Sequence, residues 1–77
     1  MKDMSQIREH MDVIASDGQQ IGTVDRIEGN ESIKLTRNDP MAKGMHHIIP
    51  TAWVSEVDDH VHLSVASKDV FENWIEA

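Results

Sequence analysis

The chain has 77 residues, no cysteine and a net charge of −7, because 14 acidic residues outweigh 7 basic ones. A chain of this length forms one domain, spanning residues 1–77, with a thin core that neither disulfides nor thiolate metal ligands can reinforce. The acidic excess argues against a nucleic-acid partner. Apolar runs are far shorter than the roughly 20 residues that span a bilayer, and residues 1–13 lack a signal-peptide apolar stretch, so we expect a cytoplasmic protein without membrane contact.

The first half of the chain predicts three strands. Residues 11–15 form the first, and the Asp-Gly pair that follows is a strong hairpin signal because glycine tolerates a positive φ. Residues 20–27 form the second. Neither of its alternating faces is purely apolar, so we expect a bend or bulge, with Gly22 as the natural place for it. Residues 32–36 alternate cleanly between apolar and polar side chains and form the third strand.

The second half of the strand region is less regular. Residues 37–45 are predicted to be a surface loop, because proline and glycine interrupt any regular element there. Residues 46–50 form a short strand ended by proline, and residues 51–65 form a hairpin around an Asp-Asp turn. We expect strands at about residues 11–65 in all, five or six of them, so the fold class is mostly β.

The register of the last hairpin depends on its turn. With a two-residue turn, Val57 lies opposite His60 and Val54 lies opposite Leu63, whereas a longer turn would shift this pairing. The alternation then predicts which side chains point inward. The expected inward set is Val13, Ile21, Val24, Ile27, Ile33, Leu35, Ile48, Val54, Val57, Val61 and Leu63.

The C-terminal segment, about residues 67–76, changes to a helical period. Its apolar residues pair at i, i+4 along one stripe: Val70, Phe71, Trp74 and Ile75. An acidic capping box beginning at Asp69, or Ser67 as an alternative N-cap, would start the helix. Such a short helix is unstable alone in water, so the stripe must pack on the open end of the β-structure or on a second subunit. We predict a homodimer with this stripe as its interface, since two-fold closure is the commonest solution.

Two longer stretches resemble a known superfamily. "MDVIASDGQQIGTVDRIEG" resembles the start of a PRC-barrel domain, in which a strand leads to a DG turn and an IGxV strand, and "HHIIPTAWVSEVDDHVHLS" resembles its second half. The resemblance covers about residues 10–65 and is especially close to a bacterial family of small proteins of unknown function placed near the PRC-barrels. It implies a small, strongly bent β-barrel, and the C-terminal α-helix expected from the periodicity at about residues 67–76 completes the predicted fold. PRC-barrels serve as docking modules, in a photosynthetic reaction-centre subunit and in a ribosome-maturation factor, and the resemblance brings no catalytic residues.

Four of the five histidines lie in that second half: His46, His47, His60 and His62. The i, i+2 spacing puts His60 and His62 on one face of a strand, about 6.5–7 Å apart at Cα, which suits two ligands of one zinc or nickel ion. His47 is the candidate third ligand of such a surface site. The simpler interpretation is that these histidines form a solvated β-face and that folding requires no metal. For these four residues the preferred functional hypothesis is a change of association between about pH 5.5 and 7.5.

Catalytic motifs are missing from the sequence. There is no nucleophile elbow, and the paired carboxylates Asp58 and Asp59 are adjacent in a tight turn, where they point apart and stay solvated. We therefore expect no enzyme and no cofactor. Three hypotheses follow: a non-enzymatic interaction or assembly module with an unknown protein partner, a metal- or pH-responsive version of that module, and an RNA-processing or ribosome-associated accessory factor, which the net charge disfavours.

Overall fold

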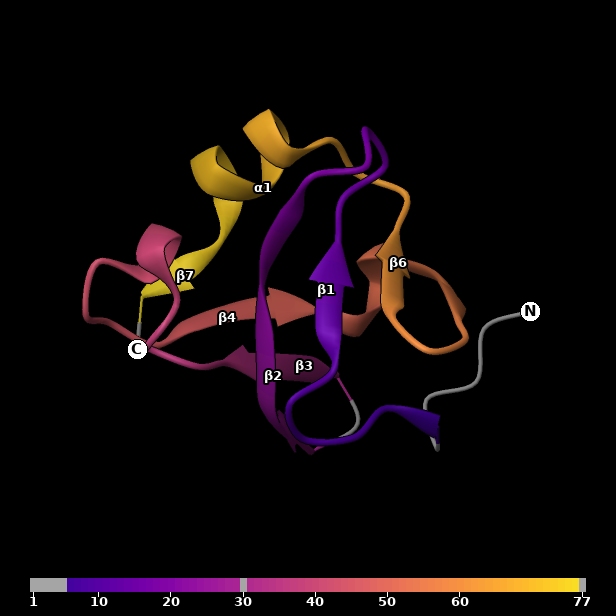
Figure 1. Cartoon of the computed structure of the whole chain (residues 1–77), viewed down its shortest axis with the longest axis horizontal. Helices are drawn as coiled ribbons and strands as arrows, with labels where there is room; N and C mark the ends of the chain where they lie inside the picture. Colours follow the sequence, from indigo (N-terminus) through magenta and orange to yellow (C-terminus); the bar gives the residue numbers. More distant parts are fainter. Residues whose placement is uncertain (1–5, 30, 77) are drawn as a thin grey trace.

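Seven strands and one α-helix make up the fold in the computed structural model, which describes residues 6–29 and 31–76 (Figure 1). The strands are β1 (Asp12–Ile14), β2 (Gln20–Glu28), β3 (Ser32–Leu35), β4 (His47–Pro50), β5 (Val54–Val57), β6 (Val61–Leu63) and β7 (Ile75–Glu76). The helix α1 covers Ser67–Asn73, and two 3-10 turns, η2 (Pro40–Ala42) and η3 (Thr51–Trp53), lie on either side of β4 in the sequence. The mostly β prediction with a C-terminal helix is confirmed.

All seven strands belong to one sheet in the order β5-β6-β1-β2-β3-β4-β7. Neighbours are antiparallel except β1 and β6, which are parallel. The sheet bends along the long strand β2, so that β3 and β4 cross behind β1 and β2 (Figure 1). Across the described residues no ladder joins β5 to β7, so the two ends of the sheet stay open and the predicted closure into a barrel is not found.

The bend of β2 arises from two bulges. Val13 pairs with Gly22 while the next residue of β1 pairs with Gln20, which leaves Ile21 as an extra residue; a second irregularity leaves Asp25 unpaired between the pairs formed by Val24 and Arg26. An extra residue in one strand increases the local twist and turns the following side chains to the other face. The sequence prediction of a bend in this strand is thus confirmed.

Gly22 lets another element approach β2 closely. A Cβ atom at this position would lie 3.3 Å from Cδ1 of Leu35 and 3.6 Å from a carboxylate oxygen of Asp39. The Asp39 carboxylate accepts hydrogen bonds from the hydroxyls of Thr23 (3.0 Å) and Thr36 (2.8 Å). These contacts tie the start of the β3–β4 loop to β2, and so they position the η2 turn that borders the pocket described below.

The register of β4 reverses one core prediction. Ile49 pairs with Ile33, which pairs with Ile27, so these three side chains share the inward face of the sheet. Ile49 is completely buried, whereas Ile48 points to the other face and is only half-buried. The prediction that Ile48 points inward is therefore wrong by one residue, and a shift of one residue exchanges the two faces of a strand.

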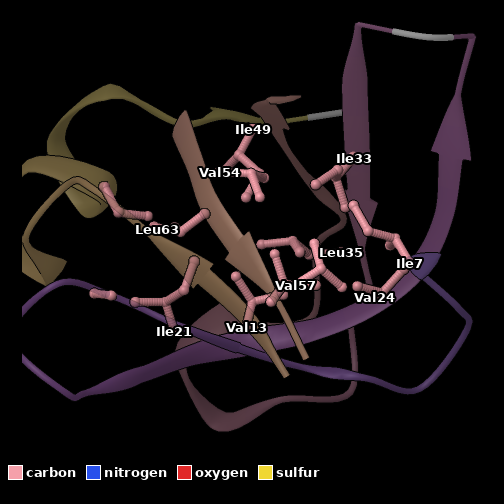
Figure 2. Packing of buried hydrophobic residues seen from close by; sticks show 13 residues of the cluster. Ile7, Val13, Ile21, Val24, Ile33, Leu35, Ile49, Val54, Val57 and Leu63 are labelled. Atoms are coloured by element: carbon pink, nitrogen blue, oxygen red, sulfur yellow. The ribbon is translucent and has the colours of Figure 1, made fainter. Parts of the chain in front are cut away.

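The core packs between the two halves of the bent sheet, where its side chains point toward one another (Figure 2). Of the predicted inward set, Ile27 is half-buried, Ile48 faces outward, and the others are buried. The structure adds members that the strand pattern did not predict. These additional buried side chains are Ile7, Ala15, Ala42, Ile49 and Val70.

The β5–β6 hairpin has a turn one residue longer than predicted. Val54 pairs with Leu63 as expected, but Val57 pairs with Val61 instead of His60. The Asp58 carboxylate accepts the backbone N–H of His60 at 2.9 Å, which stabilises the wider turn. The two-residue register is wrong for this reason.

The helix α1 begins at residue 67 as predicted, but its N-cap and its C-terminal end differ from the prediction. It ends at Asn73 because the next residues leave it to form β7 against β4, where the backbone gains ladder hydrogen bonds. Neither Asp69 nor Ser67 is its N-cap; Ala66 takes that position. The N-terminus of the helix is instead capped by a carboxylate from the β1–β2 turn. Asp17 accepts hydrogen bonds from the backbone N–H of Ser67 at 3.3 Å and from the hydroxyl of Ser67 at 2.6 Å.

Candidate functional site

The histidines of the second half are dispersed over the fold, and each has a different carboxylate as its neighbour. His60 and His62 are close together, with ring centroids 6.1 Å apart at the β5–β6 hairpin. His60 Nδ1 lies 3.8 Å from a carboxylate oxygen of Asp12, and His62 Nε2 lies 2.9 Å from Asp58 Oδ1. This pair is exposed to half-exposed and forms a small acid–histidine cluster on the surface.

The Asp58 carboxyl is the member of this cluster whose acidity changes clearly. Its hydrogen bond from the backbone N–H of His60, and next the one from the His62 ring, hold the pKa of Asp58 below its ordinary value of 3.8. Both contacts favour the ionised carboxylate. Asp58 therefore stabilises the turn as an ionised carboxylate, and the absence of acid–base chemistry at the Asp-Asp pair stays a prediction.

The structure does not bring His47 to this pair. His47 lies on β4, and β1, β2 and β3 separate β4 from β6 in the sheet. Among the described residues no group of three or more histidines and acids could hold a metal ion. The three-histidine version of the predicted site is thus not assembled, and weak surface binding by His60 and His62 alone stays a prediction.

His46 precedes β4, and His47 is the first residue of that strand. His46 donates from Nδ1 to the backbone carbonyl of Leu35 at 2.9 Å. His47 shares the inward face with Ile49 and is 4% exposed. A buried imidazole needs a reason, because polar groups lose hydration on burial and are usually hydrogen-bonded there.

The ring of His47 stacks on the indole of Trp74, with centroids 3.8 Å apart and planes inclined by 15°. Phe71 meets the same indole edge-on at 5.1 Å. His47 Nε2 lies 3.9 Å from a carboxylate oxygen of Glu76, which is its partner across the β4–β7 ladder, and Nδ1 has no hydrogen-bond partner. Aromatic stacking therefore holds this ring in place, although neither of its nitrogen atoms forms a hydrogen bond with the described residues.

These residues line a pocket of about 570 Å³. Its other walls come from Met41 and Lys43 of the β3–β4 loop, which lies beside β7 and below α1 (Figure 1). Ligand sites of similar size combine apolar walls with a few polar groups, and this one has three apolar side chains, an imidazole, an ammonium and a carboxylate. The sequence analysis did not predict this pocket, because its walls come from four separate elements. The i, i+2 spacing of His47 and Ile49 did indicate that the two side chains share one face of the strand.

The predicted interface stripe divides between two faces. Val70 is completely buried in the core, and Phe71 and Trp74 are half-buried against it, so these three residues cover their own domain. Ile75 follows after the helix has ended and pairs with Ile48 on the outward face, where it is 63% exposed. Sequence alone could not separate Ile75 from the stripe, because its i, i+4 spacing to Phe71 fits a helix.

The outward face of the sheet continues this row across four strands. Ile75, Ile48, Lys34 and Arg26 are successive cross-strand partners. Two like charges are thus neighbours on one face, and the Arg26 guanidinium relieves their repulsion through an ion pair with Glu28 at 2.9 Å. The row presents a mixed basic and apolar surface on an otherwise acidic protein.

Comparison with known families adds one identification. The profile of a family described as an uncharacterized protein conserved in bacteria (DUF2171) matches residues 7–71, which is most of the chain. The chain belongs to this family. A search of curated proteins found no match to this DUF2171 protein. In the described part of the chain, no helix combines the length and the apolar character needed to cross a bilayer.

Proposed function

We propose that this DUF2171 protein is a non-enzymatic interaction module of the bacterial cytoplasm, with a fold of PRC-barrel type, and that it works as a homodimer. The observation that carries the proposal is Ile75. It is 63% exposed, the most exposed large hydrophobic side chain of the described residues, and it lies on an edge strand. An edge strand offers unpaired backbone groups to another chain, and an exposed apolar residue there strengthens that tendency.

A second copy is the partner that this edge fits best. Two antiparallel β7 strands related by a two-fold axis would extend the sheet across the dimer, with the same patch used by both subunits. Ile75 and Ile48 of one subunit would then lie near the same residues of the other, so that the apolar end of the outward row is covered. A single domain of 77 residues buries only a modest fraction of its surface, and pairing with a second copy would raise that fraction.

Light scattering after size exclusion, across micromolar to millimolar concentrations, tests the proposal. The expected mass is that of two 8.7-kDa chains. Ile75→Lys should give a monomer, because the charge cannot be buried at the two-fold axis. Ala52→Lys is the matched control, since it adds the same charge at an exposed position of η3 and should leave the dimer intact. A monomer mass for the unaltered protein at all concentrations would refute self-association.

A pH-responsive version of the module is the second candidate. It is favoured by the cluster at the β5–β6 hairpin, where His60 and His62 each lie beside an acid, Asp12 and Asp58. A charge change at the two rings would make this acidic patch less negative, and partner affinity would change with it. Measuring the dimer mass between about pH 5.5 and 7.5 tests this version. Equal association throughout that range would leave the two histidines as a solvated face.

A further inference from the structure

The pocket beneath the C-terminal segment contains an unusual polar group. His47 is 96% buried by the side-chain and backbone atoms around it, being 4% exposed, and its Nδ1 has no hydrogen-bond partner in the described structure. Its Nε2 approaches Glu76 at 3.9 Å, which is too long for a hydrogen bond. Neither ring nitrogen of His47 is therefore hydrogen-bonded by the described residues, so a ligand in the pocket can bind Nε2 without displacing a protein partner.

The surroundings indicate which nitrogen carries the proton. A neutral imidazole has one N–H donor and one bare acceptor nitrogen. The carboxylate of Glu76 lies on the Nε2 side, and a carboxylate favours an N–H directed toward it. We therefore assign the proton to Nε2, at the wall of the pocket, and the bare acceptor to the buried Nδ1.

The second donor of the pocket is Lys43. Its ammonium has no ion-pair partner within the described residues, and its backbone adopts a left-handed conformation, with φ 54° and ψ 35°. Glycine reaches that conformation without steric cost, so a lysine side chain stands where local backbone geometry favours glycine. The Glu76 carboxylate is the one opposing charge of the lining, and its side chain is 62% exposed, so it can turn toward water.

We propose that this pocket binds a small carboxylic acid with an apolar body. The ammonium of Lys43 and the Nε2–H of His47 take the carboxylate, as paired donors do in anion sites. The thioether of Met41 and the rings of Phe71 and Trp74 enclose the apolar body. This inference does not depend on self-association, because Ile75 lies on the opposite face of the β4–β7 pair.

Three probes with the same phenyl body test the assignment: phenylacetate, the neutral phenethyl alcohol and the cationic phenethylamine. Binding is followed by NMR through the indole N–H of Trp74 and the ring signals of His47. We expect phenylacetate to shift both sets of signals and to bind at least about tenfold more tightly than either of the other probes. Tighter binding of the amine, equal binding of the alcohol, or no binding of any probe at millimolar concentration would each overturn the proposal.

Charge variants separate the roles of the lining residues. Lys43→Gln should weaken phenylacetate about tenfold and leave the alcohol unchanged, because it removes a charge-assisted hydrogen bond. Glu76→Gln should tighten phenylacetate, since it removes the opposing charge. Lys34→Gln changes the same charge on the outward face and is the matched control, with no effect expected. An equal loss in both lysine variants would mean that bulk charge, and not this pocket, attracts the acid.

Discussion

Adjacent isoleucines on β4 offer the sharpest test of the fold. Ile49 is 0% exposed and sits in the inward row with Ile33, whereas Ile48 is half-buried in the outward row. Both residues occupy the same strand and have the same chemistry. Replacing each by valine removes one methylene group, so the difference between the two variants reports the register of β4 alone.

The magnitudes follow from burial. A buried Ile→Val change costs about 0.5–1.5 kcal/mol, because lost transfer energy adds to a small cavity. We expect Ile49→Val to lie in the upper half of this range, since Ile33, its partner across the ladder, is itself completely buried. Ile48→Val should cost about 0.4 kcal/mol or less, which is roughly half the transfer energy of one methylene without a cavity.

Urea unfolding followed by tryptophan fluorescence measures both values. In a domain of this size 1 kcal/mol shifts the melting temperature by about 4–8 °C, so thermal melts provide a second reading. Ile49→Val should lower the midpoint clearly, and Ile48→Val should stay close to the unaltered protein. Equal losses, or a larger loss at Ile48, would refute the register and would favour the inward Ile48 that the alternation of the sequence suggests.

Four other outcomes are expected. The free energy of unfolding should fall as the pH drops below about 4, because the hydrogen bond from the Ser67 hydroxyl, above all, lowers the pKa of Asp17 in the folded state from 3.8. The stability that the ionised Asp17 contributes is present above its unfolded pKa and is lost as the carboxyl group protonates, so Ser67→Ala should flatten this pH dependence in urea titrations. His62→Ala should raise the pKa of Asp58 toward 3.8 only in part, as read by carbon NMR, because the backbone N–H of His60 is the larger cause. Gly22→Ala should destabilise by about 1–3 kcal/mol in chemical unfolding, since its methyl group lands 3.3 Å from a packed leucine. EDTA should leave the melting temperature unchanged, whereas a loss would reveal a structural metal.

Local chemistry in the sequence was enough to predict several elements. The Asp-Gly pair predicted the β1–β2 turn, where Gly18 has a φ of 88°. The mixed faces of residues 20–27 predicted the bend of β2, and the strict alternation of residues 32–36 predicted β3. Each of these signals acts between residues close in the chain, through backbone sterics or the two-residue period of a strand, so no knowledge of the rest of the fold was needed.

The tertiary structure alone decided the features that concern function. In residues 46–50 either of the two alternating sets of side chains could point inward. The pairing of Ile49 with Ile33 selected the set that contains His47, so this histidine is buried. The last turn expected of the helix became β7 because β4 offered hydrogen bonds to Ile75 and Glu76. The free energy of such choices lies in contacts between residues far apart in the chain, and periodicity within one segment contains no information about them. The pocket and the exposed edge both depend on that pairing.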